Sequence, residues 1–304
     1  MGRGLALICA AGIIWGTIGP AVDLVHGRSA LSVLTMSAWR SAFAVVTLAA
    51  MVLARGQFAA CAALVRAQPV RILIMGALTA AFQLLFFVSV VAAGVSVATV
   101  VALGFAPVFL LVLHSAQRRR GPSAAQSVTV AMAVTGLLLI SLVGGDAAGS
   151  SPALGVLTAL ACGTAYAMST DVGSSVSGTH DAVPVAMATM VVVAALLVPA
   201  GLVVGLIRGD SLIPADTATW AGLGYLGAVT MALAYVFLFA GLRTLPTASA
   251  SVATLLEPVT AVIIAVLLLG ERLTVAGLLG SLLIVAAIGS LALTPHVSEL
   301  PEVH

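Results

Sequence analysis

Two charged side chains lie inside long apolar stretches and are the first candidates for chemistry. Glu257 is near the middle of one stretch, directly before Pro258, and Arg40 is several residues inside another. A charge at the centre of a bilayer costs about 2.5–3.5 kcal/mol on insertion scales, so each residue needs a compensating role. For Glu257 the sequence leaves two roles open: a proton carrier or partner for a cationic group, or a structural acid that is protonated or paired with Arg40 or a neighbouring hydroxyl.

Arg40 also has two interpretations. A guanidinium is suited to clamp a substrate carboxylate with two hydrogen bonds. Alternatively, the side chain extends from its helix to the nearby outer interface, which lies about 12 Å away by helical rise. The sequence favours a structural or pairing role, with substrate contact as the second possibility.

Four further side chains are candidates to line a cavity: Trp15, Gln83, Tyr166 and Tyr235. Rings of this kind can stack on a ligand, and their polar groups can form hydrogen bonds with it. Each one taken singly is equally explained by ordinary packing with its polar tip satisfied. As a group they favour a binding site.

Pro107 and Pro258 are the candidates for helix breaks. A proline inside a helix removes one hydrogen bond and frees the carbonyl four residues earlier, here those of Leu103 and Thr254. Paired interruptions at corresponding positions point to a transporter site. The alternative is that the two prolines only shape helix packing.

The composition excludes several classes of protein. The 304 residues are 62% hydrophobic and 7% charged, whereas a soluble domain is about a quarter charged. All basic residues are Arg, so a Walker A phosphate loop, a Schiff-base lysine and ATP-driven pumping by this chain alone are excluded. The Cys and His residues are scattered, without CxxC or HExxH, and GxSxG is missing too, so we expect no metal, no cofactor and no enzyme activity. A net charge of +2 does not favour nucleic acid.

Apolar runs predict an all-α integral membrane protein. A span needs about 20 mostly apolar residues, and unpaired backbone groups are excluded from lipid. The predicted ten transmembrane helices cover residues 4–25, 32–53, 72–93, 95–114, 125–143, 152–171, 182–206, 218–241, 247–269 and 274–293. Residues 294–304 are predicted to be a short cytoplasmic tail.

The chain also aligns with itself at an offset of 151 residues. The matches include Gly12 with Gly163, Trp15 with Tyr166, Gly76 with Gly227, Phe86 with Phe237, and Pro107 with Pro258. This predicts two homologous units, 4–143 and 152–293. Each unit holds five spans, an odd number, so the second unit is predicted to enter the membrane from the opposite side as an inverted repeat.

The distribution of arginine predicts the orientation. With a cytoplasmic N-terminus, eight arginines lie on the inner side and three on the outer side, as the positive-inside rule expects. The inner set is Arg3, Arg55, Arg66, Arg71, Arg118, Arg119, Arg120 and Arg243, and the outer set is Arg28, Arg208 and Arg272. We therefore expect a bacterial plasma membrane protein with both termini in the cytoplasm.

Specific motifs resemble a known family. The stretch Leu255–Pro258 followed by Leu268–Thr274 resembles the end of an EamA-type repeat of the drug/metabolite transporter superfamily, and Gly12–Thr17 resembles its beginning, as Trp39-Arg40 resembles its second span. The resemblance covers both halves. It implies ten helices, cytoplasmic termini, a central cavity and export of metabolites, amino acids or drugs. The first half departs from the motif, because Arg119-Arg120-Gly121 stand where the second half has Gly270-Glu271-Arg272.

The predicted function is secondary transport of a small-molecule substrate by alternating access, as an exporter, with protons as the candidate coupling ion. The alternatives are an uncoupled facilitator or an uptake carrier. An intramembrane enzyme or scaffold is disfavoured, because no nucleophile–base pair lies within the spans. His114 is placed at the end of one span and Asp171 near the end of another, where a charged side chain reaches water at little cost in free energy. So few intramembrane charges favour neutral, zwitterionic or moderately hydrophobic solutes.

Overall fold

The structure is a computed structural model that describes residues 2–29, 31–141, 151–214, 216–268 and 274–293. Throughout these ranges the regular structure is helical, as expected for backbone that must satisfy its own hydrogen bonds in lipid. The predicted tail at 294–304 and the Glu271-Arg272 pair of the family motif lie outside the described residues.

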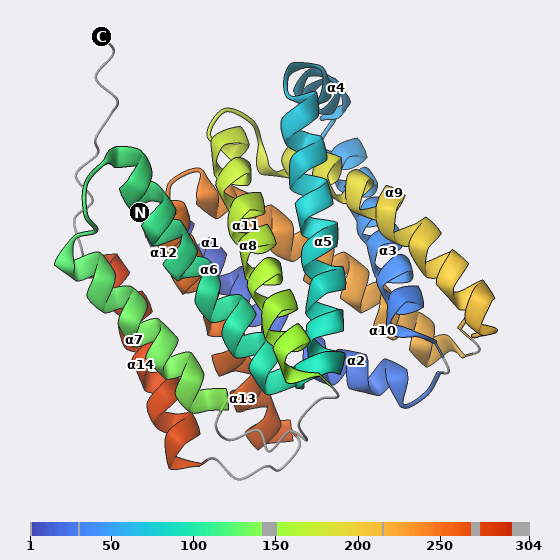
Figure 1. Ribbon diagram of the computed structural model, residues 1–304. Coiled ribbons are helices and arrows are strands. Elements are labelled where there is room, and N and C mark those ends of the chain that lie inside the picture. The colour runs from blue at the N-terminus through green and yellow to red at the C-terminus, as the bar shows by residue number, and fades with distance from the viewer. Residues whose placement is uncertain (1, 30, 142–150, 215, 269–273, 294–304) are drawn as a thin grey trace.

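The helices follow the predicted spans closely (Figure 1). The first half comprises α1 (Gly2–Gly16), α2 (Ile18–His26), α3 (Val33–Ala54), α4 (Phe58–Ala67), α5 (Pro69–Ala93), α6 (Val95–Arg118) and α7 (Ala124–Ser141). The second half comprises α8 (Pro152–Ser177), α9 (Ala182–Arg208), α10 (Thr217–Gly227), the π-helix η1 (Ala228–Leu233), α11 (Ala234–Leu242), α12 (Thr247–Ala253), α13 (Leu256–Leu268) and α14 (Val275–Leu293).

The number of membrane spans agrees with the sequence. Nine helical segments in the described ranges are long and apolar enough to cross a bilayer, and α14 is a shorter apolar helix in the tenth predicted position. The predicted first span is the pair α1–α2, the eighth is α10–η1–α11, and the ninth is α12–α13. Only the short helix α4 lies outside the ten predicted spans.

Helices from the two halves pack in a symmetric pattern. The second spans of each half, α3 and α9, contact each other, as do the fifth spans, α7 and α14. The third span of the first half, α5, packs on the first span of the second, α8, and the reverse pair, α11 on α1, is also present. A contact between elements i and j that is repeated between j and i is the signature of two-fold symmetry.

Close contacts at glycines show the same two-fold symmetry at individual residues. A Cβ added at Gly155 would collide with Ala93, and one added at Gly4 would collide with Thr244. The two contacts differ by 151 residues at both partners, the offset of the sequence repeat. Where α7 crosses α14, the relation is reciprocal: a Cβ at Gly136 would lie 2.6 Å from the Gly280 carbonyl oxygen, and one at Gly280 would lie 2.5 Å from that of Gly136.

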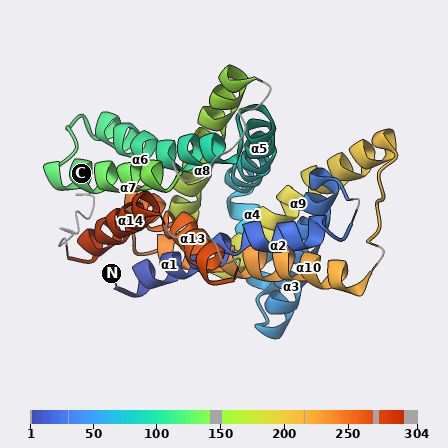
Figure 2. The same cartoon turned by 90° about the horizontal axis from the view of Figure 1, so that it is seen from below.

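The bundle has two ends, of which we call the one that carries α4 the α4 end (Figure 1). Seen along the bundle in Figure 2, α6, α7 and α14 lie on one side, α3, α9 and α10 lie on the other, and α5 and α8 run between them. The central helices therefore bring together residues from both halves of the chain.

Candidate functional site

Trp15 connects α1 to the π-helix of the eighth span. Its indole Nε1 donates a hydrogen bond of 2.9 Å to the Thr230 carbonyl oxygen. Thr230 lies within η1, where the i→i+5 pattern replaces the ordinary helical bonds and leaves room for this additional donor. The Trp15 ring also meets the Tyr235 ring edge to face, with centroids 5.5 Å apart. The first span of one half is thus joined to the third span of the other.

Tyr166 makes the corresponding connection from α8. Its hydroxyl donates to the Thr254 Oγ1 at 3.2 Å, and its ring lies 5.4 Å from the ring of Phe82 on α5. Thr254 lies in the two-residue break between α12 and α13. The break sits four residues before Pro258, which is where a proline frees the helix carbonyl. Tyr166 therefore links α5, α8 and the broken ninth span.

A small cavity lies between α5, α8 and α11. It is lined by Thr79, Phe82, Tyr166, Ser169, Thr170, Tyr235, Leu238 and Phe239. Its volume is about 10 Å³, close to the room that one water molecule needs. The hydroxyls of Thr79 and Ser169 are 2.8 Å apart and join α5 to α8 beside it. In this conformation the space between the predicted residues Tyr166 and Tyr235 is therefore nearly closed.

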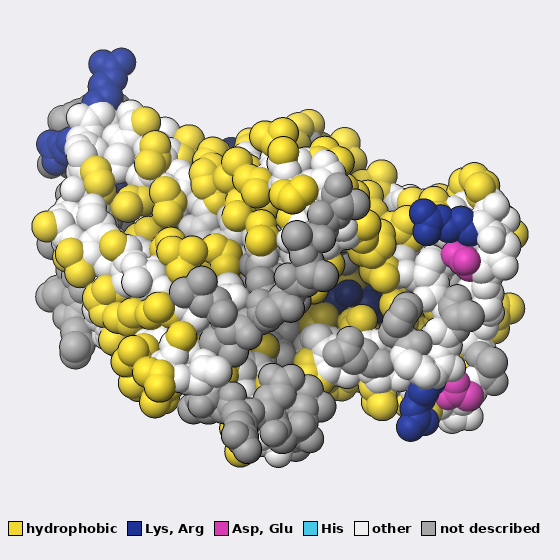
Figure 3. Space-filling view, turned by 60° about the horizontal axis from the view of Figure 1, so that its bottom comes forward, with side chains coloured by type: hydrophobic (Ala, Val, Ile, Leu, Met, Phe, Trp, Pro, Cys, Tyr) yellow, Lys and Arg dark blue, Asp and Glu magenta, His cyan; other side chains and the backbone are white. Residues whose placement is uncertain are grey.

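Arg40 on α3 is half-buried, and its Nε is fully buried with no hydrogen-bond partner among the described residues. The Arg40 carbonyl oxygen lies against Gly227, at the end of α10, so this part of α3 packs on the eighth span. Figure 3, in which the end opposite α4 comes forward, shows a hollow between apolar side chains that contains a basic side chain. A buried guanidinium nitrogen without a partner is an available donor, because burial without a hydrogen bond is costly.

Glu257 is half-buried in the first turn of α13, and its backbone N–H donates to the Thr254 carbonyl oxygen at 3.0 Å. Within the described part of the chain, two oppositely charged side-chain pairs are in contact, His114–Asp171 and Arg243–Asp181. Glu257 belongs to neither pair, so the predicted alternative of an ion pair with Arg40 is absent. The backbone of Glu257 lies against Gly12 and Gly16 of α1, the helix that carries Trp15, and Tyr166 is bonded to Thr254, three residues before Glu257.

Gln83 and the two prolines complete the predicted set. Both polar atoms of the Gln83 side chain are buried without a partner in the described structure, but Gln83 is not among the residues that line the cavity. Pro107 lies inside α6, which continues through it as one helix, so the first half lacks the break predicted there. Membrane helices tolerate such a proline because neighbouring groups satisfy the freed carbonyl. Pro258 follows the interruption in the ninth span, as predicted.

Comparison with known proteins decides the family. The profile of the EamA-like transporter family matches residues 2–142 and 153–293, one copy for each half. The chain belongs to the EamA-like transporter family. It is similar to the uncharacterized transporter YwfM of Bacillus subtilis, with 30% identity over 228 residues that span 73% of each chain. A solved crystal structure shares the fold with a TM-score of 0.81 at 16% identity, covering 96% of this chain and 97% of that one.

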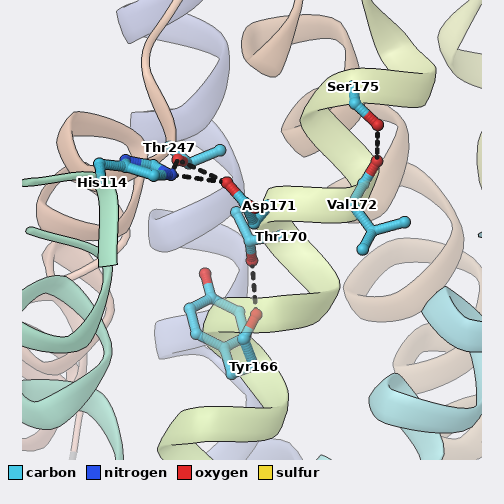
Figure 4. Close-up of polar contacts among 7 residues, drawn as sticks. All are labelled: His114, Tyr166, Thr170, Asp171, Val172, Ser175 and Thr247. Carbon is cyan, nitrogen blue, oxygen red and sulfur yellow. Dashed lines mark hydrogen bonds and ion pairs between the residues drawn. The ribbon is translucent and has the colours of Figure 1, made fainter. Parts of the chain in front are cut away.

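This EamA-like transporter contains one polar cluster that the sequence analysis did not assemble (Figure 4). His114 Nε2 on α6 and Asp171 Oδ1 on α8 are 2.8 Å apart. The Thr247 hydroxyl at the start of α12 donates to the same carboxylate oxygen at 3.4 Å and lies 3.5 Å from His114 Nε2. The sequence signal was the position of His114 and Asp171 near the ends of the fourth and sixth spans. Nothing in the sequence shows that these two spans are neighbours at that end.

Proposed function

We propose that this membrane transporter exports small zwitterionic or neutral solutes by alternating access between two inverted repeats. The observation that supports the proposal best is the cluster of Trp15, Tyr166, Tyr235 and Glu257 where the two halves meet. Residues from both halves surround one small cavity there, next to an interrupted helix. Binding at a repeat interface beside a discontinuous helix is the general arrangement of secondary transporters.

The contacts at the helix ends support inversion of the second repeat. Gly4 at the start of α1 lies against Thr244, just past the end of α11. Arg243, the residue before it, contacts Asp181 at 3.1 Å, which places the start of α9 and hence the end of α8 at this same end. The start of α8, by contrast, lies against the end of α5 through Gly155 and Ala93. The first helices of the two repeats thus begin at opposite ends of the bundle.

The charges favour a zwitterion as the substrate. Arg40 offers a guanidinium nitrogen that has no partner among the described residues, and Glu257 offers a carboxyl in no ion pair of the described structure. A substrate carboxylate placed toward Arg40 and an ammonium group placed toward Glu257 would satisfy both partners. The rings of Trp15 and Tyr235 would then cover the apolar part of the solute.

Glu257 is the proposed proton carrier, because a half-buried carboxyl between the repeats can exchange a proton and a cationic substrate group. An uncoupled facilitator or an uptake carrier of the same solutes is the alternative. Coupling and direction are separable: a facilitator equilibrates its solute whatever the pH gradient, whereas an exporter protects cells against a toxic solute that it removes.

Purified protein in liposomes tests the proposal. Flux of a panel of labelled amino acids should exceed that of protein-free liposomes, with no change in the solute. Arg40→Gln should lower the flux of zwitterions about tenfold or more, because it leaves a desolvated carboxylate without its charged partner. Arg208→Gln, at the exposed end of α9, is the matched control and should transport as wild type.

Three results would contradict parts of the proposal. A chemically altered product would indicate an enzyme. Equal flux in Arg40→Gln and Arg208→Gln would remove Arg40 from the site. Flux that is insensitive both to collapse of the pH gradient and to Glu257→Gln would exclude proton coupling through Glu257 and favour the facilitator.

A further inference from the structure

The cluster of His114, Asp171 and Thr247, which we call the His114 bridge, connects the two repeats at one end of the bundle. His114 belongs to the fourth span of the first repeat, whereas Asp171 and Thr247 belong to the sixth and ninth spans in the second. The imidazole and the carboxylate are 27% and 34% exposed, so both can exchange protons with water. Three helices from two halves are therefore joined by one cluster in which His114 and Asp171 titrate and Thr247 contributes a hydroxyl.

The bridge lies near the α4 end, because α6 and α8 end within two turns of His114 and Asp171 and α12 begins at Thr247. This end also carries Arg118, in the last turn of α6, and Arg243. By the positive-inside rule it is the proposed cytoplasmic end. For a solute to pass this end, α6 must separate from α8 or α12.

The bridge is not repeated at the equivalent positions of the duplicated fold. At the repeat offset of 151 residues, Ala265 corresponds to His114 and Pro20 corresponds to Asp171. Neither alanine nor proline has a side chain that can form a hydrogen bond or an ion pair. The two copies thus differ at these positions in a titratable contact.

We propose that the His114 bridge is a proton-operated latch that holds the α4 end closed and makes opening at this end dependent on pH. The inference rests on the proposed alternating access and adds a control at this end. A proton on His114 converts its hydrogen bond to Asp171 into an ion pair. The attraction between the two opposite charges then adds to the hydrogen bond.

The titratable side chains on the neighbouring helices indicate that His114 and Asp171 are the pair that responds to pH. Of the helices packed on α6, neither α7 nor α12 contains a titratable residue, and α5 carries only Arg71, which is exposed in its first turn. On α8 the next ionisable side chain is Tyr166. Beside α8, α11 contributes Tyr235, and Arg243 is engaged by Asp181 at the start of α9.

The direction of the response follows from the charge on the imidazole. At a pH low enough to protonate His114 while Asp171 stays ionised, the latch is strongest and the α4 end is closed. When the imidazole is neutral, its N–H still donates to the ionised carboxylate, but the attraction between opposite charges is lost and opening becomes easier. For a partly exposed pair, this loss corresponds to a change of about fivefold in the ratio of closed to open molecules.

Distances between spin labels at the α4 end test the latch directly. The full-length protein would carry labels at Gln117→Cys on α6 and Ser175→Cys on α8, both exposed, with Cys9, Cys61 and Cys162 replaced, in lipid nanodiscs. Between about pH 5 and 8, the range in which histidine titrates, the ratio of closed to open molecules should fall about fivefold. In His114→Gln and in Asp171→Asn the populations should not depend on pH. His180→Gln, which removes a half-buried histidine just past the end of α8, is the matched control and should respond as wild type does.

The proposal is overturned if the wild-type distances do not change over this range, or if both His114→Gln and Asp171→Asn still follow pH as wild type does. The measurement requires no solute flux, so it separates the latch from the transport proposal. Protein that moves no solute but shows the expected pH response would refute transport and retain the latch. Protein that moves solute without the pH response would refute the latch and retain transport.

Discussion

The crossing of α7 and α14 gives the sharpest prediction about stability. Gly136 and Gly280 face each other there, and each approaches the other's backbone. We consider Gly280→Ala, which adds one methyl group to α14. The neighbour that it meets is a carbonyl oxygen of α7, which cannot rotate away as the end of a flexible side chain would.

The size of the effect follows from the distances. The new Cβ would lie 2.5 Å from the Gly136 oxygen, 2.9 Å from the Ile140 backbone nitrogen and 2.9 Å from the Ile140 side chain, whereas ordinary contacts begin at 3.4 Å. The two helices must therefore separate by nearly 1 Å, and a gap of 0.5–1 Å forfeits a quarter to a half of each neighbouring dispersion contact. Overpacking of this kind destabilises by about 1–3 kcal/mol. We expect the unfolding temperature to fall by several degrees.

Thermal unfolding in detergent measures this effect. A thiol-reactive dye would report exposure of Cys162, which is fully buried, after Cys9 and Cys61 are replaced by alanine. The matched control is Gly289→Ala on the same helix, where an added Cβ meets nothing within 4 Å. This control should unfold at the wild-type temperature or slightly above it, because alanine restricts the unfolded chain.

The double variant Gly136→Ala with Gly280→Ala refines the test. Either methyl group alone already separates the helices. The second substitution should therefore reduce the stability by less than it does as a single change in the wild type, and the two losses should not be additive. The reasoning is refuted if Gly280→Ala unfolds as the wild type does. It is also refuted if Gly289→Ala loses as much stability, because the loss would then belong to α14 in general.

Two further predictions concern hydrogen bonds. Trp15→Phe keeps a ring but removes the donor to the Thr230 carbonyl, so the protein should lose about 1 kcal/mol of stability and transport more slowly; unchanged stability and flux would show that this bond is unimportant. Asp216 caps α10, and the hydroxyl and the backbone N–H of Thr219 donate to its carboxylate, which lowers its pKa below the ordinary value. Because the pKa of Asp216 is lower in the folded state, the ionised carboxylate stabilises the fold at pH values above its ordinary pKa. This stability is lost as the pH falls through the folded-state pKa. Between pH 7 and 3 the unfolding temperature should therefore fall further in wild type than in Asp216→Ala. Parallel curves for the two proteins would contradict this role.

The spans were predictable because lipid imposes a length and a polarity on every helix that crosses it. The second span, for example, was expected at 32–53 and is Val33–Ala54. The short helix α4 was not predicted, since its ten residues are too few to span the bilayer. The π-helix was missed as well, because nothing in the run Ala228–Leu233 distinguishes it from ordinary apolar helix.

The candidate site was predictable in part. Trp15, Tyr166 and Tyr235 were chosen because their rings and polar groups could line a cavity, and the structure brings Trp15 against Tyr235 and places Tyr235 and Tyr166 around one cavity. The His114 bridge was missed because the apolar runs end at residues 114 and 171, while the helices continue to Arg118 and Ser177. Both residues therefore looked like surface charges at helix ends. Which helices are neighbours is a tertiary property that hydropathy does not contain.

The π-helix distinguishes the two copies of the duplicated scaffold. A π turn is wider than an α-helical turn, and η1 lies in the eighth span, whereas the equivalent third span is the uninterrupted α5. The offset of 151 residues holds on both sides of η1, at Gly76 and Gly227 before it and at Phe86 and Phe237 beyond it, so no residue has been inserted. The wider turn therefore changes the backbone hydrogen bonding of one copy alone, and it is the Thr230 carbonyl of this turn that accepts the Trp15 indole N–H.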